Sequence, residues 1–352
     1  MCPGPSPAPT IVAPNRSGSV SAMSGFWRRR STPVRDFVVS RLVSGIVSLI
    51  LITALIFVGT ALLPGDAASA LLGQNATPAA IEALRRDFGL DQPLVQRYFL
   101  WLLSALHGDF GTSLASGRPV AEVLLPRLAN SLILAAAGAL FLLPIAIGGG
   151  ILAAIWQDRW FDRLLGFTSM LFLAMPAFLV GYILIYVFAV RLGLFPPMSV
   201  APFYRGAAAW VPILVLPVVS LVVIGQAHTM KLTRTAILAV LASDYILMAE
   251  IKGIPRSRII LRHALPNALS PILSITILTV AYLIIDVVVI EIVFSYPGLG
   301  KLMVDSVAYR DLTVVQACGL LFAAIFVTMN FLADFLALLA NPRQRVPARG
   351  AS

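Results

Sequence analysis

The sequence predicts an all-α protein that crosses a lipid membrane six times. Six stretches contain no Asp, Glu, Lys or Arg, and each is 22 to 30 residues long. A helix needs roughly 20 apolar residues to cross the hydrocarbon core of a bilayer. Only 12% of the 352 residues are charged, whereas soluble domains carry about 25%. The charge-free stretches are 42–65, 128–157, 164–190, 206–230, 263–285 and 312–333.

The residue pattern within these stretches favours helices over the strands of a membrane barrel. Barrel strands alternate polar and apolar residues over about 10 positions. Runs such as Ala135–Leu143 and Ile272–Ile285 do not alternate. Prolines inside the stretches, Pro176 among them, predict kinks where a backbone hydrogen bond is lost. The predicted spans are about 42–63, 129–156, 164–190, 208–230, 268–290 and 313–336.

The basic residues predict the orientation of these spans. With the N-terminus in the cytoplasm, 17 of the 26 Lys and Arg residues lie on the cytoplasmic side. This bias is typical of membrane topology, and it explains the net charge of +10 better than nucleic-acid binding does. Both termini are therefore expected in the cytoplasm. We expect a disordered basic leader at 1–34, a transmembrane domain at 35–343 and a cytoplasmic tail at 344–352.

Two loops are too long to be simple connections. The outer loop 66–127 either forms a small subdomain that meets a partner or caps the bundle, and both interpretations stand. The inner loop 231–267 is strongly basic, and Gly253 and Pro255 divide it into two helical segments. Gly253 permits a tight bend without a Cβ clash, and proline is tolerated in the first turn of a new helix.

The inner loop resembles the signature loop in permeases of binding-protein-dependent ABC importers. It reads Asp-Tyr-Ile-Leu-Met-Ala-Glu-Ile-Lys-Gly over 244–253 and Arg-His-Ala-Leu-Pro-Asn over 262–267. Gly253, Leu265 and Pro266 have the spacing of that signature. The Glu-Ala-Ala-like triplet is degenerate, because only Ala249 of residues 247–249 matches it.

Other motifs narrow the resemblance to the first permease subunit of the dipeptide, oligopeptide and nickel branch. They are Leu-Pro-Gly-Asp at 63–66, Gly-Leu-Asp-Gln-Pro-Leu at 89–94, Gly-Asp-Phe-Gly at 108–111 and Glu291 through Gly300, followed by Arg310 and Asp311. The resemblance covers about 35–343. It implies a type I ABC importer permease fold in the bacterial inner membrane.

The resemblance also implies the function and the partners. The chain is expected to form half of the pathway for peptides or similar small solutes. Its expected partners are a homologous second permease, two ABC ATPases and an external solute-binding protein. No catalytic, cofactor or metal residues are expected, and ATP is expected on the partner subunits. A P-loop is absent around Gly300-Lys301, where Ser295 replaces the first glycine. The alternative is a self-sufficient secondary transporter or channel without an ATPase.

The candidate site residues form two groups. In the first, the basic side chains are expected to contact an ATPase or lipid headgroups, and small Ala249 is expected to pack in a groove of the partner. These coupling residues are Asp244, Ala249, Lys252, Gly253, Arg256, Arg258, Leu265, Pro266 and Asn267.

The second group is Asp286 and Glu291, which lie in span five or at its outer end. Charges inside a membrane are costly and are usually functional. The two carboxylates either face the translocation path or outer gate, or pair with Arg310 or a partner subunit. Both interpretations remain open.

Overall fold

A computed structural model describes residues 34–62, 77, 79, 82, 92–200 and 210–340. The predicted leader up to residue 33 and the predicted tail 344–352 lie outside these residues. Five of the described helices are long and apolar enough to cross a membrane. They are α1 (Val34–Ala61), α5 (Val120–Ile155), α8 (Trp210–Leu241), α11 (Leu265–Val293) and α13 (Leu312–Ala340).

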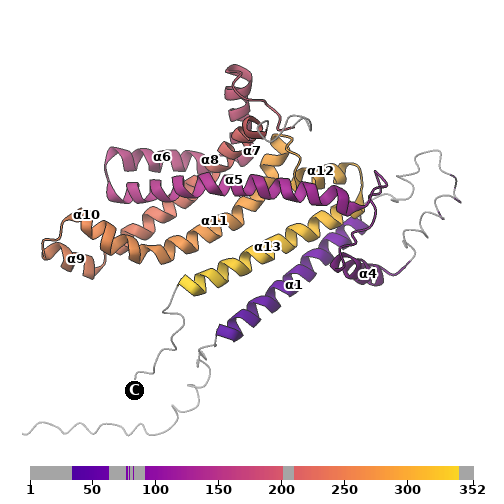
Figure 1. Cartoon of the computed structure of the whole chain (residues 1–352), viewed down its shortest axis with the longest axis horizontal. Coiled ribbons are helices and arrows are strands. Elements are labelled where there is room, and N and C mark those ends of the chain that lie inside the picture. The colour runs from indigo at the N-terminus through magenta and orange to yellow at the C-terminus, as the bar shows by residue number, and fades with distance from the viewer. Residues whose placement is uncertain are drawn as a thin grey trace, which may run out of the picture.

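The third predicted span is broken. It consists of α6 (Trp160–Ala174) and α7 (Ala177–Leu184), and the π-helix η1 (Ile185–Arg191) continues α7. The two parts are bent by 106° and count together as a sixth span. Pro176 follows Met175, whose backbone is extended, as the residue before a proline prefers. The expected kink is therefore a complete break, and α7 turns away from α6 (Figure 1).

Several helices continue past the charges that bounded the predicted spans. Helix α5 begins at Val120 rather than near 129, and α8 ends at Leu241 rather than near 230. Charged side chains near a helix end reach the aqueous interface, so they do not stop the helix. As a result, part of each long predicted loop is helical.

Close approach of α5 and α8 forms the centre of the bundle. A Cβ atom on Gly150 would lie 2.7 Å from the backbone oxygen of Met230, and one on Gly225 would lie 2.1 Å from Leu142. Small residues let membrane helices pack at short distance, where van der Waals contact is strongest. Buried apolar side chains of α5, α8 and α11, such as Leu142, Leu221 and Leu283, complete this core.

Helices α1 and α13 form an antiparallel pair along one side of the bundle (Figure 1). The Gln316 amide donates to the hydroxyl of Thr60 at 2.8 Å, deep in the interface. At the other end of the pair, Arg41 lies 3.2 Å from Asp334. The start of α1 and the end of α13 are therefore at the same end of the molecule.

Short helices cover the two ends of the bundle. At one end lie α9 (Asp244–Ile251), α10 (Arg256–Arg258) and the π-helix η3 (Ile259–Ala264). At the opposite end lie α4 (Leu94–Leu106) and α12 (Leu299–Ala308) (Figure 1). Tyr98 ties α4 to α1, because its hydroxyl lies 2.9 Å from that of Thr53.

Candidate functional site

Helix α9 is attached to the bundle by one narrow face. Ile246 and Ala249 are buried against Ile259 and Ala264 of η3 and against the end of α8. Ala249 is 8% exposed. Its small side chain lets η3 pack closely against α9. The close packing expected of Ala249 is with η3 in this structure, and its part in coupling stays a prediction.

Gly253 ends α9 in a tight left-handed turn. Its φ of +73° is a conformation that side chains with a Cβ rarely adopt. The Ile254 amide donates to Ala249 O at 3.2 Å, and the Gly253 amide donates to Glu250 O at 2.9 Å. These two bonds form a Schellman motif, in which glycine is the preferred residue. No atom of the described residues lies within 4 Å of a Cβ placed on Gly253, so the backbone conformation rather than crowding explains the glycine.

The outer face of α9 is apolar and exposed. Leu247 is 54% exposed, Met248 57% and Ile251 69%. The coupling residues Asp244, Lys252, Arg256 and Arg258 are also exposed, at the start of α9 or in the turn and helix that follow it. An apolar patch with a charged rim is typical of a protein-binding surface.

A continuous helical path leads from this surface into the bundle. Helix α10 runs directly into η3, and η3 runs into α11 at Leu265. Pro266 follows the π-helix η3 inside this continuous helix, where it removes one backbone hydrogen bond. The side-chain amide of Asn267 donates to His263 O at 2.7 Å and joins η3 to α11. The α9–α10 segment is thus joined to α11 without a loop.

Glu291 occupies a closed site at the opposite end. Its carboxylate is fully buried and accepts hydrogen bonds from the Ser131 hydroxyl and the amides of Gly300 and Lys301, the Gly300 bond at 2.7 Å. These amides lie in the first turn of α12, whose dipole also stabilises an anion. Glu291 therefore joins α5, α11 and α12, and no described contact links it to Arg310.

Tyr296 strengthens the same junction. Its hydroxyl donates to Asn130 O at 3.0 Å, and the Asn130 side chain donates to Pro297 O at 2.8 Å. Burial, and secondly the charge of Glu291, raise the pKa of Tyr296 to about 12. The phenol thus remains a neutral donor throughout the physiological range.

Asp311 forms a second buried carboxylate site. The residue belongs to a motif of the sequence resemblance, but no role was predicted for it. It is 3% exposed and accepts hydrogen bonds from the Ser113 hydroxyl at 2.5 Å and from the amides of Leu114 and Ala115. It also accepts from Thr313 in the first turn of α13. Asp311 therefore fixes the segment before α5 to the start of α13. The paired Gly-Asp-Phe-Gly and Arg-Asp motifs were the sequence signal for this contact.

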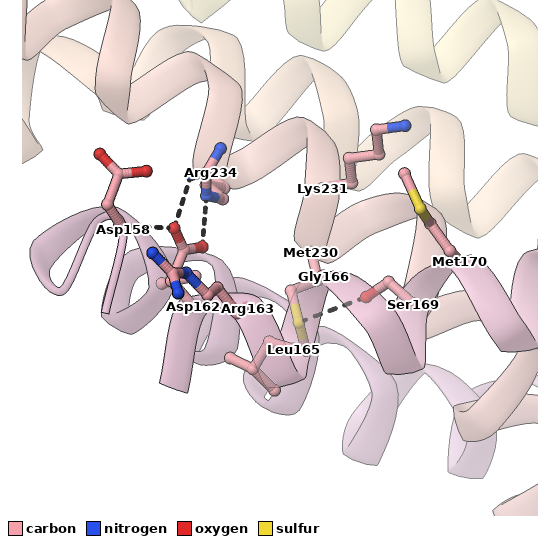
Figure 2. Close-up of a pocket in the computed structure, with 11 residues that line it drawn as sticks. Asp158, Asp162, Arg163, Leu165, Gly166, Ser169, Met170, Met230, Lys231 and Arg234 are labelled. Atoms are coloured by element: carbon pink, nitrogen blue, oxygen red, sulfur yellow. Dashed lines mark hydrogen bonds and ion pairs between the residues drawn. The ribbon is translucent and has the colours of Figure 1, made fainter. Parts of the chain in front are cut away.

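An ion pair between α6 and α8 was also missed by sequence reasoning. The Arg234 Nε and Nη2 atoms lie 2.6 and 2.7 Å from the two carboxylate oxygens of Asp162 (Figure 2). Asp162 is 7% exposed, and the Asp158 amide also donates to it. The pair forms one wall of a cavity of 340 Å³ that Lys231 and Met170 also line.

Asp286 differs from the other acidic residues of the bundle. It is half-buried in the outer half of α11 and forms no hydrogen bond or ion pair with any described residue. The two candidate carboxylates of span five therefore do not form one site. Glu291 is enclosed, and Asp286 lies at the edge of an exposed face.

These features define a polytopic integral membrane protein with an exposed docking-type segment at one end. Residues 146–346 match the family described as the binding-protein-dependent transport system inner membrane component, and residues 34–135 match the N-terminal membrane component of that system. The chain belongs to this family. It is a permease subunit of an ABC importer and a multi-pass protein of the bacterial inner membrane, as the sequence resemblance predicted.

Similar proteins support the same assignment. The glutathione transport system permease protein GsiC of Escherichia coli K12 is 36% identical over 310 residues, which are 88% of this chain and 99% of that protein. The GsiC proteins of Shigella dysenteriae serotype 1 and Shigella flexneri serotype 5b match with the same identity and coverage. The similarity thus extends through the helices, the outer loop and the α9–α10 segment.

Proposed function

We propose that this permease forms half of an ATP-driven solute pathway and receives the force of ATP hydrolysis through α9, Gly253 and α10. Its partners are a homologous second permease, two ATPases that bind the ATP, and an external solute-binding protein. The observation that carries the proposal is the exposed apolar face of Leu247, Met248 and Ile251, with exposed Lys252, Arg256 and Arg258 following directly in the chain.

The attachment of this segment supports a lever-like role. One buried face holds α9 against η3, and η3 continues into α11 without a loop. An ATPase that moves α9 thus moves a helix that crosses the membrane. The Gly253 turn fixes the angle between α9 and α10, so the segment transmits displacement with little internal bending.

The proposed orientation places α9, α10 and both ends of the chain in the cytoplasm. The distribution of 17 of 26 basic residues supports it. The Arg41–Asp334 pair supports it too, because it brings the two terminal spans together at one end.

The proposed solute is a small peptide. The named relatives belong to glutathione transport systems, and glutathione is a modified tripeptide. Their similarity over nearly the whole chain makes glutathione the first solute to test.

The decisive experiment compares the complete importer with the isolated chain in proteoliposomes. We expect glutathione or peptide uptake only when the second permease, both ATPases, the binding protein and ATP are present. Uptake by the chain alone would favour the self-sufficient transporter instead. Cysteine at Met248 should crosslink to an ATPase subunit, whereas cysteine at buried Ile246 should not.

A further inference from the structure

One exposed face of α8, in the half of the helix nearer α9, carries polar side chains. His228, Lys231 and Thr235 are all exposed, and their spacing of three and four residues places them on one side of the helix. His228 lies within the predicted span 208–230, where lipid-facing residues are normally apolar, and Lys231 and Thr235 lie in the inner loop that follows this span. This face of α8 therefore borders either water or another protein.

Helix α11 carries a second exposed stripe, in which Ser274 and Tyr282 supply the polar groups. Ser274, Leu278 and Tyr282 are exposed at four-residue intervals, and half-buried Asp286 follows one turn later. Tyr282 is 53% exposed, and no described residue shields it. Like the stripe on α8, this one includes a charged residue.

The two stripes lie on the same side of the bundle. Helices α8 and α11 are antiparallel neighbours, joined where the Thr229 and Thr279 hydroxyls lie 2.8 Å apart. Both are backed by α5: Gly150 of α5 packs against Met230 of α8, and Ser131 of α5 binds Glu291 of α11. Because α8 and α11 both pack against α5, their exposed sides both face away from α5.

Lys231 and Asp286 are opposite charges without a described partner on this face. Figure 2 shows the Lys231 side chain beside Met170, away from the Asp162–Arg234 pair. From the Thr229–Thr279 contact, Lys231 lies two residues toward the α9 end and Asp286 lies seven residues toward the α12 end. At 1.5 Å per helical residue, the two positions are about 13 Å apart along the bundle. An extended chain of roughly four residues has this length.

The geometry points to this face as the wall of the solute path, with Asp286 as the position that attracts a protonated amine and Lys231 as the position that attracts a carboxylate. The class of solute is a small zwitterion such as a short peptide. This inference rests on the proposed function and names the surface on which the solute is recognised within the membrane.

The first test measures water access in the complete importer, reconstituted in lipid nanodiscs. Single cysteines replace Tyr282, Asp286 or Lys231 in a background with Cys2→Ser and Cys318→Ala. Membrane-impermeant methanethiosulfonates should modify all three in at least one nucleotide state. Two control positions should remain unmodified: Leu283→Cys, which is 3% exposed, and Leu55→Cys on the apolar face of α1, which is 76% exposed.

The second test measures the local charge with cationic and anionic methanethiosulfonates. Normalised to a free thiol, Tyr282→Cys should react about tenfold faster with the cationic reagent, because Asp286 lies one turn away. Asp286→Asn should abolish this preference. Thr235→Cys should prefer the anionic reagent, and Lys231→Met should abolish that preference.

Two outcomes would overturn the inference. In the first, the cysteines react in the isolated chain but in no state of the assembled importer, which would show that the second permease covers this face. In the second, the reagents show no charge preference that depends on Asp286 or Lys231. Neither outcome depends on transport, so failure of the proposed function would be seen separately as the absence of ATP-dependent uptake.

Discussion

The Ser131 hydroxyl in α5 donates a hydrogen bond to the fully buried carboxylate of Glu291 in α11. The two residues are 160 positions apart in the chain, and the same carboxylate binds the first turn of α12. This single group therefore fixes the relative positions of three helices at the end opposite α9.

Replacing Glu291 with alanine should lower the free energy of unfolding by about 3 kcal/mol or more. The substitution leaves the Ser131 hydroxyl and two backbone amides buried without an acceptor. Thermal unfolding of the purified chain in detergent measures the loss. Glu122→Ala is the matched control, because Glu122 is exposed and pairs only with Arg118. Equal stability of the two variants would refute the anchoring role of Glu291.

Gly150→Ala should destabilise the α5–α8 pair by about 1–3 kcal/mol, because the new methyl group meets the Met230 backbone oxygen at 2.7 Å. Gly148→Ala is the control in the same helix, since no atom lies within 4 Å of its Cβ position. Alanine has the higher helix propensity, so Gly148→Ala should be neutral or slightly stabilising. The melting temperatures of the two variants measure these effects. An equal drop in melting temperature in both variants would contradict the close packing of α5 against α8 at Gly150.

Arg310→Gly should preserve or raise stability, by up to about 1 kcal/mol. Arg310 ends α12 with a φ of +56°, which glycine adopts without strain. Arg310→Val should lower stability by about 1–2 kcal/mol for the opposite reason. A marked loss in the glycine variant would instead show that the arginine side chain has a structural partner.

The Asp162–Arg234 pair should show a coupling energy of about 1–3 kcal/mol in a double-mutant cycle with Asp162→Asn and Arg234→Met. The contact is bidentate, Asp162 is buried, and the Arg234 side chain is 31% exposed, which limits the value through solvent screening. The exposed Arg118–Glu122 pair supplies the comparison and should give less than about 0.5 kcal/mol. If the Asp162–Arg234 coupling energy were also less than about 0.5 kcal/mol, the pair would have no role in holding α6 to α8.

The sequence predicted the spanning elements because lipid imposes a long apolar run on each span. It misplaced helix ends such as Val120 and Leu241, because charge runs mark the edge of the hydrocarbon and not the end of the helix. It predicted a kink at Pro176 but not a 106° break, which depends on how α7 packs against α8 and α11.

The candidate site was predicted in part. The Gly253 turn depends on the local backbone conformation, so its position could be predicted from the sequence. The inward side of Ala249 and the partners of Glu291 depend on residues far away in the chain, such as Ile259 and Ser131. For the same reason, Arg234 was interpreted only as an orientation signal and Asp162 was given no role.

The most direct test of coupling through α9 is ATP-dependent uptake by the complete importer with Gly253→Asp. Aspartate strains the left-handed turn and adds a side chain and a charge at the exposed edge of the coupling surface. We expect at least a tenfold loss of uptake while membrane insertion persists, and Gly253→Asn separates the effect of the charge from that of the side chain. Unchanged ATP-dependent uptake in Gly253→Asp would contradict the assignment of this segment as the link to the ATPases.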